Sequence, residues 1–189
     1  MPDLILRIIR MSSISFGMNY GSILGLLLVV ISVLFHAFGI LDFEKPVLFF
    51  IINTLVITFF LIFSVIQYRD VYNDGFLLYS ESLKIAVTIT VFSSFVFGFW
   101  KVIFLNFISP EYVELYIQYA EQQLLENADA FEKLDFNTDD LLDKLESSRE
   151  NFTPLRIMTV EIIKKALGGF LLGLIISIFT KNENLNKIA

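Results

Sequence analysis

Three ionisable residues, Glu161, Lys164 and Lys165, stand immediately before an uncharged run of 15 residues, Ala166–Thr180. Ionisable groups at membrane depth are costly, and they are functional candidates by default. Glu161 precedes the two lysines by four residues or fewer, which is the favourable order for ion pairs along a helix. We therefore expect these intramembrane charges to be structural, pairing along the helix and with the outer interface. Transport or proton movement is the alternative.

An acidic segment gives a second group of candidate ligands. Acids and an amide occupy five ligand positions of a calcium-binding loop pattern, namely Asp135, Asn137, Asp139, Asp143 and Glu146. The sixth position of that pattern requires glycine for a sharp turn, and here it is Asp140. The same residues form a helix start in which Thr138 is the cap and acids fill the first turn. We favour the helix and expect no metal site.

The chain lacks most of the residue types and motifs that enzyme active sites use. The sequence has no cysteine and a single histidine, His36, so thiolate, disulfide and histidine-rich metal sites have no ligands. It contains no glycine-rich phosphate loop, no paired carboxylates within an apolar run, and no nucleophile with a recognisable base. We expect a protein that is not an enzyme, with no catalytic residue and no cofactor.

Charge is unevenly distributed along the chain. The segment 111–150 carries twelve acidic and three basic residues, a balance of −9, so the rest of the chain is +3 within a total of −6. No basic face is present of the kind that nucleic-acid binding requires. The sequence therefore predicts no nucleic-acid partner.

Long uncharged runs define the class of protein. Phe16–Leu41 and Pro46–Gln67 contain no charged residue in 26 and 22 positions, and the whole chain is 56% hydrophobic. Because a helix rises about 1.5 Å per residue, either run can cross a hydrocarbon core about 30 Å thick. A soluble helical bundle would rarely need helices so long and so uniformly apolar. The sequence predicts an all-α polytopic membrane protein with the lipid bilayer as its first partner.

Turn and capping signals divide this single membrane domain. Pro46 suits the first position of a helix, Asn73-Asp74-Gly75 is a turn signal, Ser80 is a candidate cap, and Ser109-Pro110-Glu111 marks a new helix start. The expected segments are a cytosolic lead or interfacial helix (1–15), four spans (16–41, 46–67, 81–108 and 157–180), an extracytoplasmic acidic helical hairpin (110–152) and a cytosolic tail (181–189).

Basic residues in the short loops predict the orientation. Arg7, Arg10, Arg69, Lys181 and Lys187 fall on one side of the four predicted spans, and the turn opposite holds only Lys45. The positive-inside rule then places both termini in the cytosol and the acidic hairpin outside. We expect a multi-pass protein of the bacterial inner (cytoplasmic) membrane.

Small residues recur every fourth position in the first and last spans: Gly17, Gly21 and Gly25, then Gly169, Gly173 and Ser177. Such strips allow close helix approach, which supplies dispersion contacts in lipid. We expect both strips to pack against helices. Whether they face each other or a partner subunit is open at this point.

The order of these features resembles the domain-of-unknown-function 4199 family. The resemblance rests on the glycine-spaced first span, Tyr68-Arg69-Asp70 ending the second, the turn at Gly75, and Ser80-Glu81-Ser82-Leu83-Lys84 opening the third. It implies a small bacterial protein with four spans and a charged helical segment between the last two. It implies no activity. Genes of the family often lie near genes for lipid-linked-sugar glycosyltransferases, which suggests an accessory role in the envelope.

Three functions follow as hypotheses. The first is an accessory or scaffolding subunit of an envelope complex, which meets a protein partner or a second copy through spans 1 and 4 or the acidic hairpin. A small oligomeric transporter or channel is the second. The third is a helper of a lipid-linked-sugar glycosyltransferase.

Overall fold

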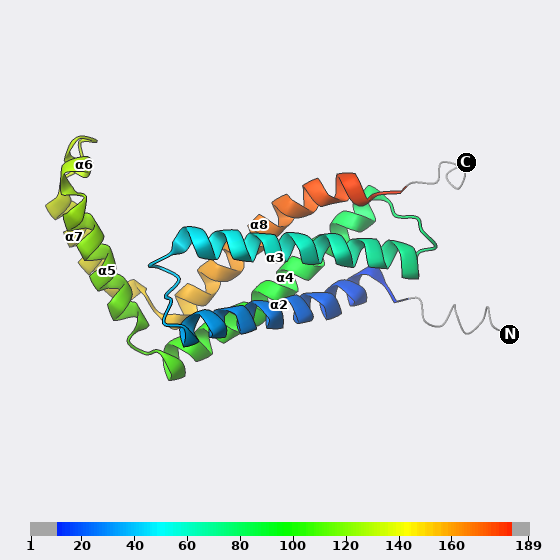
Figure 1. Cartoon of the computed structure of the whole chain (residues 1–189), viewed down its shortest axis with the longest axis horizontal. Coiled ribbons are helices and arrows are strands. Elements are labelled where there is room, and N and C mark those ends of the chain that lie inside the picture. Colours follow the sequence, from blue (N-terminus) through cyan, green and yellow to red (C-terminus); the bar gives the residue numbers. More distant parts are fainter. Residues whose placement is uncertain (1–10, 183–189) are drawn as a thin grey trace.

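The computed structural model describes residues 11–182 of the 189-residue chain. In that range, four helices are long and apolar enough to cross a membrane: α2 (Ser13–Ala37), α3 (Pro46–Gln67) with the π-helix η1 (Tyr68–Tyr72), α4 (Tyr79–Ile103) with the π-helix η2 (Phe104–Ile108), and α8 (Pro154–Thr180). They lie side by side, and both ends of the described chain are at the same end of the bundle (Figure 1). The predicted lead 1–15 and tail 181–189 lie mostly outside the described residues.

Local signals fix where these helices begin and end. Ser12 caps α2 by accepting a hydrogen bond from the Ser15 amide at 3.1 Å. The helix ends at Ala37, four residues before the end of the uncharged run, because Gly39 adopts a φ of +68° and glycine takes this left-handed conformation at no steric cost. Thr153 caps α8, so that helix starts at Pro154, three residues before the predicted boundary. Ser80 is not a cap, because α4 already begins at Tyr79.

Helix α4 lies at the centre of the bundle, and the glycine strip of α2 packs on it. A Cβ atom added to Gly17 would lie 2.7 Å from the Thr88 Cβ, and one added to Gly25 would lie 2.5 Å from the Val96 Cβ. At Gly21 the nearest atom would be the Ile89 carbonyl oxygen, also at 2.7 Å. Only glycine allows the two backbones to approach this closely.

The strip on α8 faces the same central helix. A Cβ on Gly169 would collide with the Thr90 side chain, and one on Gly173 would lie 3.1 Å from the Ala86 Cβ. Ser177 accepts a hydrogen bond from the Ser82 hydroxyl at 3.0 Å. Both strips are therefore occupied within the chain, so a partner of α2 or α8 would have to use other faces of these helices.

A helical arm leaves the bundle between α4 and α8. It consists of α5 (Tyr112–Glu126), the one-turn α6 (Ala128–Glu132) at its tip, α7 (Thr138–Ser147), and the 3-10 turn η3 (Arg149–Asn151). Helices α5 and α7 lie against each other, and the arm runs across the end of the bundle, with its tip beyond the bundle's side (Figure 1). Its position outside a bilayer remains a prediction.

Candidate functional site: the charged cluster between bundle and arm

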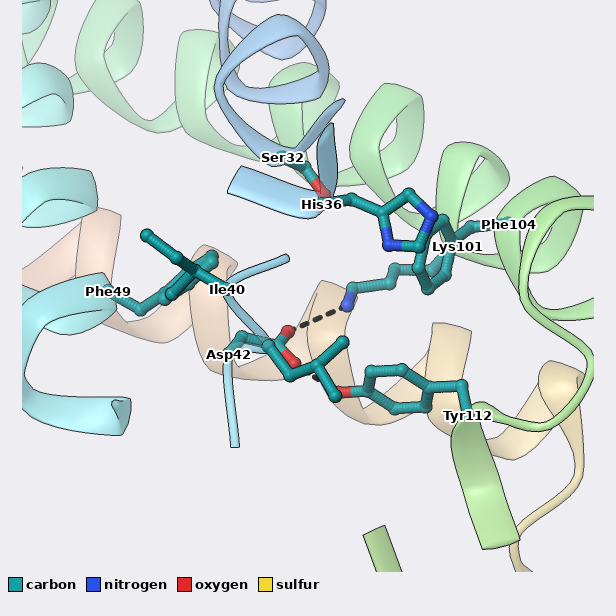
Figure 2. A pocket seen from close by; sticks show the side chains of 9 residues that line it. Ser32, His36, Ile40, Asp42, Phe49, Lys101, Phe104 and Tyr112 are labelled. Carbon is teal, nitrogen blue, oxygen red and sulfur yellow. Dashed lines mark hydrogen bonds and ion pairs between the residues drawn. The ribbon is translucent and has the colours of Figure 1, made fainter. Parts of the chain in front are cut away.

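One lysine of α4 is buried among groups from three parts of the chain. Lys101 is only 5% exposed, and its Nζ lies 2.8 Å from Oδ2 of Asp42 in the loop between α2 and α3. The other carboxylate oxygen accepts a hydrogen bond from the Tyr112 hydroxyl of α5. Figure 2 shows the ammonium and the phenol meeting at this carboxylate. Asp42 thus links the bundle, the loop and the arm.

Aromatic rings surround the same ammonium group. Its Nζ lies 5.1 Å from the centroid of Tyr112, 5.5 Å from Phe104 and 6.0 Å from Phe97. A cation within about 6 Å of a ring face is attracted by the ring quadrupole, and more strongly when water is excluded. A small pocket beside the cluster is also lined by Ser32 and His36 (Figure 2).

The electrostatics of the site favour an ionised Asp42. Burial by itself would raise the pKa of this carboxyl, but the Lys101 charge and the hydrogen bonds from Lys101 and Tyr112 outweigh burial. The pKa of Asp42 therefore lies below its ordinary value. Burial, followed by the Asp42 charge and hydrogen bond, raises the pKa of Tyr112, so its hydroxyl stays protonated and continues to donate.

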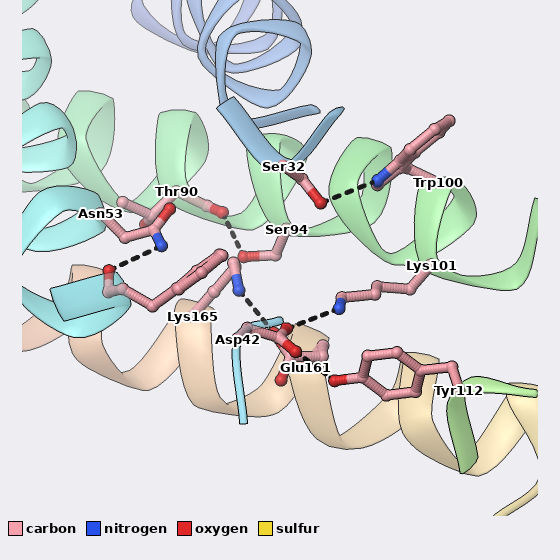
Figure 3. Close-up of polar contacts among 11 residues, drawn as sticks. Ser32, Asp42, Asn53, Thr90, Ser94, Trp100, Lys101, Tyr112, Glu161 and Lys165 are labelled. Carbon is pink, nitrogen blue, oxygen red and sulfur yellow. Dashed lines mark hydrogen bonds and ion pairs between the residues drawn. The ribbon is translucent and has the colours of Figure 1, made fainter. Parts of the chain in front are cut away.

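Two of the three ionisable residues singled out on α8 form a second pair. Glu161 Oε2 and Lys165 Nζ are 2.5 Å apart, with side chains 24% and 17% exposed. Lys165 Nζ lies 4.1 Å from the centroid of the Phe97 ring and Lys101 Nζ lies 6.0 Å from it, so one ring is near both lysines. Figure 3 shows this second pair close to the Lys101–Asp42 pair. Lys164 is exposed, and among the described residues it makes neither a hydrogen bond nor an ion pair.

A ring cluster attaches the arm to the bundle beside the charges. Phe43 follows Asp42, and its ring centroid lies 5.2 Å from Tyr112, 5.7 Å from Tyr116 and 5.5 Å from Tyr119. These three tyrosines recur along one side of α5, so a single phenylalanine of the loop contacts more than one turn of the arm. Offset and edge-on ring pairs of this kind each contribute about 0.5–1.5 kcal/mol beyond their burial.

The acidic segment 135–146 is helical from Thr138 onward. Asn137 caps α7 by accepting from the Asp139 amide at 2.8 Å, so the cap lies one residue before the predicted Thr138. Residues 138–146 then run along the helix, and across residues 11–182 no three His, Cys, Asp or Glu side chains gather as a possible metal site.

Neither Asp42 nor Lys101 was singled out from the sequence as a site residue. A lysine near a span end is expected to extend its ammonium to the headgroups, and instead it is buried against Asp42. A usable signal was present, because four spans place the 42–45 turn and the end of the third span on one side. Phe97 lies four residues before Lys101 and Phe104 three residues after it, so both share its helix face. Neither ring can neutralise the lysine, so its counter-charge has to come from another segment.

The fold and the cluster define the class: an all-α, multi-pass membrane protein whose four candidate spans carry a helical arm. The family described as Protein of unknown function (DUF4199) matches residues 19–182. The chain belongs to this family. Comparison with curated proteins and with solved structures finds no match.

Proposed function

We propose that the chain is a non-enzymatic accessory or scaffolding subunit of an envelope membrane complex. The observation that carries the proposal is the attachment of the arm. Its base is held by the Tyr112–Asp42 hydrogen bond and by the contacts of Phe43 with three tyrosines of α5. A loop that only connects two spans needs no such attachment.

The arm has the properties of a presented surface. Its twelve acids and three bases between residues 111 and 150 give it a strong negative field, which attracts basic partners and speeds their encounter. Arg149 at its base bonds Glu114 of α5 and, at 3.2 Å, Glu146 of α7. This arginine ties the two arm helices together, so the arm offers a fixed shape to a partner.

Native mass spectrometry of the full-length protein, extracted from its own membranes in mild detergent, tests this role. We expect a specific complex with a different protein. The double variant Phe43→Ala, Tyr112→Phe should release much of that partner because it loosens the arm, whereas the exposed control Lys164→Gln should retain it. A homo-oligomer around an axis lined by Asn53, Thr54 and Thr58 would contradict the proposal.

The charges on the candidate spans support a second candidate, a small oligomeric transporter or channel. Lys101, Glu161 and Lys165 are ionisable groups on candidate spans, and such groups often mark ion or proton paths. Their close pairing favours a structural role instead. The third hypothesis, a helper of a lipid-linked-sugar glycosyltransferase, is a special case of the accessory role, and the identity of the co-purified protein decides it.

A further inference from the structure

We infer that the tip of the arm is a docking site for a basic amphipathic helix of another protein, an inference that rests on the proposed scaffolding role. Within the described chain but outside the four candidate spans, four large apolar side chains are more than half exposed. One is Phe38, next to the end of α2. The other three are in the tip: Leu125 at 61%, Leu134 at 67% and Phe136 at 53%.

The tip combines these apolar side chains with acids. Four exposed acids lie in the same stretch 125–136, namely Glu126, Asp129, Glu132 and Asp135, and Lys133 is the single base there. Exposed apolar side chains accompanied by charges of one sign are typical of a protein interaction site. It matches a helix that carries leucine-like side chains on one face and lysine or arginine along the flanks.

Charge complementarity selects this occupant over others. A second copy would present the same acidic tip, and like charges across an interface cost binding free energy. A bilayer surface is a poor fit, because membranes with anionic lipids repel an acidic segment. Both ends of the described chain lie at the opposite end of the bundle from the arm (Figure 1), which favours an occupant from another molecule.

The backbone of the tip keeps two of these apolar side chains exposed. The Phe136 amide donates a hydrogen bond to the Phe131 carbonyl at 3.0 Å, and Asp135 adopts a φ of +66°. This turn directs the chain from α6 into α7 over five residues that belong to neither helix. Leu134 and Phe136 are on that turn, where neither arm helix covers them.

A peptide-binding experiment tests the site directly. The full-length protein in nanodiscs of zwitterionic lipid is titrated with a fluorescent helical peptide that carries leucines on one face and lysines on the other. Anisotropy is corrected with empty nanodiscs. We expect saturable binding that weakens at least about tenfold in the apolar variant Leu125→Ser, Leu134→Ser, Phe136→Ser, as loss of three apolar contacts implies.

Two charge variants test whether the peptide binds at the tip or is attracted by the negative charge of the whole arm. Neutralising the tip with Asp129→Asn, Glu132→Gln, Asp135→Asn should weaken binding far more than the control Glu111→Gln, Glu121→Gln, Glu150→Gln, which removes as many charges elsewhere on the arm. Equal losses in the two variants would overturn the inference, and so would unchanged binding in the apolar variant.

Two further measurements keep this inference distinct from the scaffolding role. If the native complex survives in the apolar tip variant, the docking site is wrong while the scaffold stands. If the wild type yields no complex but binds the peptide at the tip, the scaffold is wrong while the site stands. Because the chain has no cysteine, a spin label at Leu134→Cys reports its surroundings. Shielding of that label by lipid would overturn the docking site.

Discussion

At the scale of single residues, the burial of Lys101 has a direct consequence for stability. Its side chain is 7% exposed, whereas the Asp42 side chain is 30% exposed. Removing the carboxylate therefore leaves a charge that water cannot reach, while removing the lysine leaves one that water can partly solvate. The two halves of this pair are not equivalent.

We predict that Asp42→Asn destabilises the protein by about 2–3 kcal/mol, somewhat less than the cost of breaking a fully buried pair. Lys101→Met should cost less, and the double variant Asp42→Asn, Lys101→Met should recover most of the loss because no buried charge remains. Thermal unfolding in detergent measures all three. A double variant as unstable as the sum of the single ones would show that the pair is not coupled.

The lowered pKa of Asp42 gives a pH dependence of defined sign. A carboxyl whose pKa is lower in the folded state contributes stability at any pH above its unfolded value, which is about 3.9. That contribution is lost as the pH falls from about 3.9 through the folded value. We expect the unfolding temperature of the wild type to drop more steeply in this window than that of Asp42→Asn. Parallel curves would contradict the assignment.

The Glu161 pair allows a test that distinguishes structure from function. Ion pairs at this spacing contribute about 0.2–0.5 kcal/mol in water, but this one is largely shielded, and a lone buried charge costs more. We expect Glu161→Gln to lower detergent stability more than the triple variant Glu161→Gln, Lys164→Leu, Lys165→Leu. A stable Glu161→Gln protein that has lost its cellular phenotype would instead indicate an ion or proton site.

At the scale of elements, the adjacent glycines of α8 form a matched pair. A Cβ on Gly169 would collide with Thr90, whereas one on Gly168 has nothing within 4 Å. We expect Gly169→Ala to cost about 1–3 kcal/mol, as overpacking does. Gly168→Ala should be neutral or stabilising, because alanine favours the helix. Unfolding of both variants in the same detergent decides this, and equal effects would show that α8 does not approach α4 so closely.

The helices were predictable from the sequence to different degrees. Uncharged runs revealed the long apolar helices because membrane-spanning length leaves a signal in composition alone. Helix ends depended on single residues such as Gly39 and Asn137, whose caps compete with neighbours of similar propensity. The glycine strips were visible, yet their partner was not. Spacing shows that a helix face is flat, and only the tertiary arrangement places Thr90 or Val96 against it.

The charged cluster was the least predictable part of the site. Asp42 and Lys101 are 59 residues apart, and no local pattern joins a loop acid to a lysine of a distant helix. Tyr112 fits the helical spacing of apolar positions that continues through Leu115, Tyr116 and Tyr119 on α5. Its hydroxyl adds a role that hydrophobic periodicity does not report, because periodicity registers the ring and ignores the donor.

At the scale of the whole molecule, the orientation of the bundle in a membrane decides which compartment the arm faces. The ends of the described chain lie at one end of the bundle and the arm at the other (Figure 1). Once the bundle spans a bilayer, the arm and the termini are therefore on opposite sides. The excess of arginine and lysine at the ends of the predicted spans on the terminal side favours the cytosol for that side.

Cysteine accessibility decides this orientation, since the parent chain has no cysteine to interfere. Asn127 is exposed between α5 and α6, and Asn184 belongs to the C-terminal tail. In intact cells, a membrane-impermeant maleimide should label Asn127→Cys and leave Asn184→Cys unlabelled until the membrane is permeabilised. Exposed Leu115→Cys, on α5, is a second reporter for the arm. The reverse pattern would place the acidic arm in the cytosol, where its docking partner would then have to be a cytosolic protein or domain.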